Sequence, residues 1–158
     1  MANPTEGTYR MSIRRKMPAP REVVYEAWID PQGIREWMCP GDVTSAEAVL
    51  DVRVGGAYRI VMKGKERDHV HTGVYRVVEP NAKLVFTWTQ EGNDVVTLVT
   101  VEFLAHGNES ELVLTHERFT KADVAKRYES GWGTIAEKLS SYLAHQRRGV
   151  VSAESQRK

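Results

Sequence analysis

Apolar and polar residues alternate through the middle of the chain, and this pattern predicts a series of β-strands. Between residues 57 and 63, Tyr58 and Ile60 fall on one face and Arg59 on the other, because successive side chains of a strand point to opposite faces. Clusters of glycine, proline and asparagine separate the alternating segments. The predicted strands are Thr8–Lys16, Val43–Val54, Ala57–Lys63, His69–Glu79, Lys83–Gln90, Val95–Ala105 and a last strand with Leu112, Leu114 and His116 on one face.

A different spacing marks the helical parts. Two short helices are predicted after the first strand, one carrying Trp28 and the next carrying Trp37. Near the end of the chain, apolar residues recur at steps of four, four, three, four and three, which is one continuous helical face. These residues are Val124, Tyr128, Trp132, Ile135, Leu139 and Tyr142. A helix from Lys121 to about Arg147 would be roughly 40 Å long. The order predicts an α+β fold, with a curved antiparallel sheet wrapped around the long C-terminal helix.

Composition narrows the class of protein. A length of 158 residues corresponds to about one domain, which we expect at residues 8–147, with flexible termini at 1–7 and 150–158. The 22 basic and 21 acidic side chains give a net charge of +1, so we expect no nucleic-acid partner. No apolar run approaches the roughly 18 residues of a membrane helix, and Cys39 is the single cysteine. We therefore expect a cytoplasmic protein without membrane insertion, disulfide or multi-cysteine zinc site.

Four stretches carry a resemblance that covers about residues 8 to 147. They are YEAWIDPQGIREWMCP (25–40), DVRVGG (51–56), EPNAKLVFTW (79–88) and YESGWGTIAEKLSSYL (128–143). Together they resemble the family related to the C-terminal domain of the activator of heat-shock-protein-90 ATPase, in the helix-grip START and birch-pollen-allergen (SRPBCC) superfamily. The resemblance implies the helix-grip fold, with a cavity between sheet and C-terminal helix that takes an apolar or amphipathic small molecule.

The large inward-facing residues are the candidates for the lining of that cavity. They are Tyr58, Met62, His71, Tyr75, Phe86, Trp88, His116, Tyr128 and Trp132. The motifs of the family are structural and do not specify an activity. We expect a binding protein for an apolar or amphipathic small molecule. The alternatives are an enzyme such as a cyclase, isomerase or hydrolase that uses the same cavity, and a stress protein associated with a chaperone ATPase.

Histidines and tyrosines are the candidates for chemistry. His71, His116, Tyr58 and Tyr75 could act in acid–base catalysis, or could be hydrogen-bonded core residues. His69 and His71 share a strand face with Cβ atoms about 6–7 Å apart, which is a workable span for two imidazoles on one metal ion. A catalytic zinc needs a third protein ligand, so we expect no metal and no cofactor. The pair could instead form a polar cavity wall or an exposed strand end.

Two glycines flank Trp132 inside the predicted long helix. Each interior glycine costs about 1 kcal/mol relative to alanine, so Gly131 and Gly133 need a reason. Either the helix packs closely against neighbouring backbone, or the missing side chains leave space for a ligand beside Trp132.

The sequence also predicts a homodimer. The segment Val43–Val54 has apolar residues on both faces, and Trp37 and Met38 precede it closely. Exposed apolar patches of this kind often form interfaces. The alternative is that the two short helices cover these residues within one chain. The first strand, which carries Arg10, Arg14, Arg15 and Lys16, is expected at a charged sheet edge.

Overall fold

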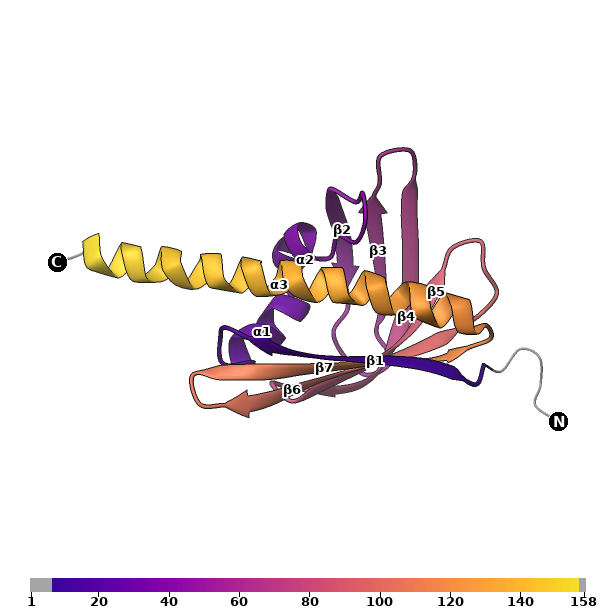
Figure 1. The fold of residues 1–158 in the computed structure, drawn as a ribbon, viewed down its shortest axis with the longest axis horizontal. Helices are drawn as coiled ribbons and strands as arrows, with labels where there is room; N and C mark the ends of the chain where they lie inside the picture. Colours follow the sequence, from indigo (N-terminus) through magenta and orange to yellow (C-terminus); the bar gives the residue numbers. More distant parts are fainter. Residues whose placement is uncertain (1–6, 157–158) are drawn as a thin grey trace.

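The computed structural model describes residues 7–156, and its elements follow the predicted order (Figure 1). They are β1 (Tyr9–Met17), α1 (Arg21–Trp28), α2 (Pro31–Trp37), β2 (Ser45–Leu50), β3 (Ala57–Lys63), β4 (Asp68–Glu79), β5 (Lys83–Gln90), β6 (Thr97–His106), β7 (Glu109–Phe119) and α3 (Ala122–Gln156). Residues 1–6 and 157–158, which belong to the termini predicted to be flexible, lie outside the described residues.

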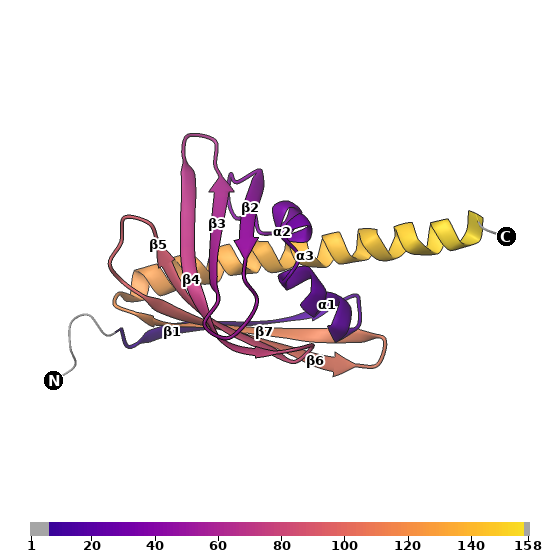
Figure 2. The same ribbon diagram turned by 180° about the vertical axis from the view of Figure 1, so that it is seen from behind.

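The strands form one antiparallel sheet in the order β1-β7-β6-β5-β4-β3-β2. The sheet bends strongly. In Figure 1, β2 to β4 stand nearly upright, whereas β1, β6 and β7 run across the view. Helix α3 lies along the inner side, as the view from behind also shows (Figure 2). Helix α1 contacts β6 and β7, and α2 contacts β2 and α3, so the short helices close one end of the enclosed space. This is the predicted helix-grip arrangement.

Burial follows the predicted alternation. In β7, Leu112, Leu114 and His116 are buried and the residues between them are less so, as expected for one core-facing side of a strand. The predicted charged edge is also confirmed, since β1 is a terminal strand of the sheet. None of the helices within residues 7–156 has the length and hydropathy needed to cross a membrane.

The ladder between β4 and β5 is interrupted opposite Thr87. There the Val74 N–H donates to Thr87 Oγ1 at 2.9 Å, and the buried Tyr58 hydroxyl donates to the Thr87 carbonyl. Gly73 makes room for this arrangement, because a Cβ atom there would overlap the Thr87 carbonyl oxygen and lie 2.6 Å from Tyr58 Oη. A side chain at position 73 is therefore incompatible with this interruption of the β4–β5 ladder.

A buried chain of hydrogen bonds joins α3 to the sheet. Trp132 Nε1 donates to His116 Nδ1 at 3.0 Å, His116 Nε2 lies 2.7 Å from Thr97 Oγ1, and Thr97 Oγ1 donates to the Trp88 carbonyl at 2.9 Å. An indole N–H can only donate, so His116 Nδ1 is unprotonated and its proton is on Nε2. Burial, and secondarily the nearby His71, lower the pKa of His116 to about 3. His116 is thus a neutral imidazole with both nitrogens hydrogen-bonded.

Two predicted boundaries are corrected. The strand expected at Val43–Val54 is only Ser45–Leu50 long, because residues 51–56 form a turn in which Arg53 Nε donates to the Asp51 carboxylate at 2.9 Å. Gly55 in that turn has a φ of 85°, which favours glycine. Helix α3 continues to Gln156, beyond the predicted end near Arg147. The prediction followed the periodic apolar residues, and the helix extends past the last of them.

The predicted apolar surface patch at Trp37 and Met38 is wrong. These side chains are 0% and 2% exposed. Trp37 packs against Trp28, with ring centroids 4.9 Å apart, and α2 contacts α3. The short helices therefore bury this turn within one chain, which was the alternative. Val49 and Val54 remain 76% and 66% exposed on β2 and just after it.

We expect Gly73→Ala to destabilise the protein by about 3 kcal/mol, at the upper end of overpacking costs, because the clashing atoms include backbone. Gly133→Ala is the matched control. A Cβ at Gly133 meets nothing closer than 4.0 Å, so this change should stabilise α3 by about 0.5–1 kcal/mol. Urea unfolding of both variants measures the difference, and equal effects at the two positions would contradict the account of the ladder break.

We expect stability to fall between about pH 6.5 and pH 3 as His116 is forced to protonate. The folded-state pKa of His116 lies below its unfolded-state value, so the unfolded chain binds the extra proton first as the pH falls. The free energy of unfolding therefore decreases by up to about 1.4 kcal/mol per pH unit. The stabilisation is complete above that window. His116→Asn can still accept from Trp132 but removes this titration. Denaturant unfolding at pH 7 and pH 5 should show a smaller pH-dependent loss in the variant, and an unchanged loss would exclude His116 as its source.

Candidate functional site

A groove of about 400 Å³ lies between the first half of α3 and the end of the sheet formed by β3, β4 and β5. Its walls come from four parts of the chain that are distant in sequence. The lining residues are Pro40, Gly41, Asp42, Val43, Met62, His69, His71, Trp88, Gln90, Asn93, Val124, Arg127, Tyr128, Gly131, Trp132 and Ile135. The α1 and α2 end of the enclosed space is filled by packed side chains, so the groove occupies the opposite end.

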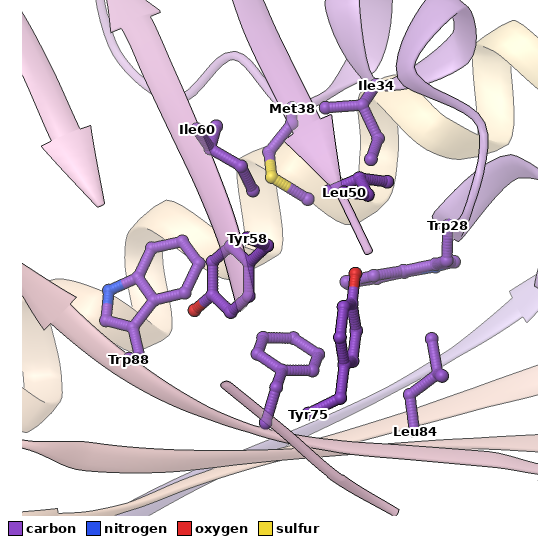
Figure 3. A pocket seen from close by; sticks show the side chains of 10 residues that line it. Trp28, Ile34, Met38, Leu50, Tyr58, Ile60, Tyr75, Leu84 and Trp88 are labelled. Atoms are coloured by element: carbon purple, nitrogen blue, oxygen red, sulfur yellow. The ribbon is translucent and has the colours of Figure 1, made fainter. Parts of the chain in front are cut away.

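The structure brings together five of the nine predicted lining residues in this groove. They are Met62, His71, Trp88, Tyr128 and Trp132. Three others, Tyr58, Tyr75 and Phe86, lie toward the filled end around a void of only about 20 Å³ (Figure 3). The ninth, His116, is fully buried beneath Trp132 and Trp88.

Among the acid–base candidates, two have their hydrogen bonds inside the core. Tyr58 donates to a backbone carbonyl, and His116 is bonded at both nitrogens. Burial raises the pKa of Tyr58 and of Tyr75 well above the usual tyrosine value. These residues match the expectation for hydrogen-bonded or packed core groups, and His71 is the candidate that reaches the groove.

His71 is the buried polar residue of the groove wall. Its ring stacks on the Trp88 indole, with centroids 4.4 Å apart and planes at 27°. The side chain is 5% exposed, and its Nδ1 has no hydrogen-bond partner among the described residues. Burial, and secondarily His69, lower the pKa of His71 to about 4, so the imidazole is neutral at pH 7. A buried polar atom without a partner is costly, which makes His71 a ready contact for a ligand.

His69 lines the same groove as His71, as expected for two residues on one face of β4. The bulge in β4 lies between Tyr75 and Val77 and so leaves this face unchanged. Within residues 7–156, no group of three His, Cys, Asp or Glu side chains is arranged to hold a metal ion. His69 and His71 both line the groove and form part of its polar wall.

Gly131 opens the groove on the helix side. Among the described residues, a Cβ atom at this position would approach only Pro40 Cβ, at 3.9 Å. Close packing against neighbouring backbone does not explain this glycine, and the missing side chain leaves space beside Trp132. Gly133 is not part of the lining, and in the part of the chain that the structure describes an added Cβ there meets only Arg15 Nη2, at 4.0 Å.

The sequence did not predict that Arg127, Gln90, Asn93 and the loop residue Asp42 line the groove. Arg127 precedes Gly131 by four residues and so shares its helix face, a signal that was available in the periodicity. Gln90 ends β5, and Asn93 follows the next turn, where its N–H donates to the Gln90 carbonyl at 3.0 Å. Their position depends on how that strand is paired. Asp42 lies in the loop after α2, where its carboxylate accepts from the Lys65 N–H at 3.3 Å. No local pattern predicts that contact between two loops.

The comparisons with known proteins agree with the fold. A protein from Rhodobacter sphaeroides has 24% identity and a TM-score of 0.78, over 89% of this chain and 95% of that one. A protein from Chromobacterium violaceum has 22% identity and a TM-score of 0.74, over 85% and 96%. The Mll3558 protein from Rhizobium loti has 26% identity and a TM-score of 0.71, over 85% and 96%.

No curated protein matches the chain in sequence. The family match is much broader than any single motif, since it runs from the loop after β1, through β2 to β7, and across the part of α3 that lines the groove. Over residues 18–144 the chain matches the family described as Activator of Hsp90 ATPase homolog 1-like protein, and it belongs to that family.

Proposed function

We propose that the protein binds an apolar or amphipathic small molecule in the groove beside α3. The observation that carries the proposal is the open space at Gly131, next to Trp132, in a groove of about 400 Å³. Ligand sites commonly have volumes of about 300–1,000 Å³. An interior glycine weakens a helix, so an open glycine at this place favours a role in admitting a ligand.

The wall chemistry supports an amphipathic ligand. Met62, Trp88, Trp132 and Ile135 supply apolar surface, and an apolar ligand gains about 25 cal/mol for each Å² of surface removed from water. The amides of the wall, His71 and the exposed Arg127 at the rim can bond a few polar atoms. Predominantly apolar walls with a few convergent polar groups are typical of small-molecule sites.

We expect tryptophan fluorescence to change on titration with fatty acids, flavonoids or sterols, because two of the four indoles line the groove. Gly131→Leu fills the space and should weaken binding about 10- to 100-fold. Gly133→Leu adds the same side chain outside the lining and should leave the affinity unchanged. Equal affinities of both variants and the unsubstituted protein would place the ligand elsewhere.

A homodimer remains part of this proposal, at β2, because of the two expected locations, the Trp37–Pro40 turn and the neighbouring strand, the turn is buried. This strand is a sheet edge, and Val49 and Val54 are exposed on it and just after it, a combination that favours pairing with another chain. Light scattering at micromolar concentration should give twice the mass of one chain, reduced to one chain by Val49→Glu. A single-chain mass before substitution rejects the dimer.

A further inference from the structure

A second, smaller chamber adjoins the groove. It has a volume of about 210 Å³ and reaches Phe119 and Lys121 near the start of α3. Five residues line both cavities, so their side chains form the wall between them. These shared residues are Trp88, Gln90, Asn93, Val124 and Tyr128.

Within this wall, Tyr128 is the large side chain contributed by the helix. Its ring packs edge-on to His116, with centroids 4.8 Å apart, and against Phe119 at 5.2 Å. Its hydroxyl oxygen accepts from Trp88 Nε1 at 3.3 Å, which is long for an N–H···O bond. The phenol therefore stands between the two chambers and is held mainly by ring contacts.

Trp88, the other large residue of the wall, is held more firmly than Tyr128. The Trp88 indole stacks on His71, and its ring lies 5.2 Å from that of Trp132. Its backbone carbonyl accepts from Thr97. Trp88 therefore forms a fixed floor under both chambers, and the boundary between them depends on Tyr128.

We propose that Tyr128 determines ligand length, by ending the groove against an extended apolar chain. This inference rests on the proposed function and names its ligand class as an unbranched amphipath such as a fatty acid. The apolar chain lies in the groove along its Trp132 and Ile135 wall and ends at the phenol ring. The acid end stays at the exposed rim, where Arg127 has no ion pair with any described residue. Without the ring, the chain continues into the smaller chamber.

The test uses saturated fatty acids of about eight to about sixteen carbons, titrated below their micelle concentrations. The affinity of the unsubstituted protein should rise about fourfold per methylene and then level off at the length that meets Tyr128. In Tyr128→Ala and in the more conservative Tyr128→Leu, the plateau should begin about two or more methylenes later, since buried chain gains affinity per methylene. Tyr128→Phe keeps the ring and should keep the original plateau.

Circular dichroism and urea unfolding establish that each variant is folded, and Tyr128→Leu serves if Tyr128→Ala is not. A plateau at the same length in all folded variants overturns the role of Tyr128 while the proposed function stands. If no chain length binds the unsubstituted protein, the proposed function fails for this class and the inference fails with it. A crystal structure of Tyr128→Ala gives a ligand-free readout. Joined chambers support the inference, and chambers still separated by repacked side chains overturn it.

Discussion

The hydrogen bond from the Trp132 indole to His116 fixes the long helix on the sheet. Because the indole N–H can only donate, this one contact determines the tautomer of His116 and thereby the direction of the next two bonds, through Thr97 to the Trp88 carbonyl. This chain of hydrogen bonds runs from α3 through β7 and β6 to β5. It holds the two tryptophans of the groove in a fixed relation, so the wall of the groove is built on the same interaction that attaches the helix.

The space inside the bent sheet is used in two different ways. At one end, α1, α2 and the residue after α2 supply Trp28, Ile34 and Met38, which fill the space against the aromatic residues of β3, β4 and β5. At the other end neither α1 nor α2 borders the groove, and Gly131 of α3 has no side chain to fill the space. Trp88 lies at the junction and borders both parts. The position of the short helices therefore decides where the groove lies.

Periodicity predicted which face each residue occupies but not its place along the enclosed space. The bounds of β3 and β5 agree with the alternating pattern, and the inward direction of His71 and His116 followed from it. Tyr58 and Met62 share one strand face, yet only Met62 reaches the groove. That difference depends on what α1 and α2 cover, as does the burial of Trp37. Such contacts join segments far apart in sequence, and no local pattern encodes them.

The pairing of β1 with β7 has a consequence for synthesis of the chain. Ile13 lies opposite Leu114, so the first strand is made about 100 residues before its only neighbour in the sheet. At about 5–20 residues per second, β1 waits for roughly 5–20 seconds after it leaves the ribosome. Its basic side chains, among them Arg14 and Lys16, oppose pairing with other nascent chains during that interval. The charged edge thus protects the unfinished protein as well as the finished one.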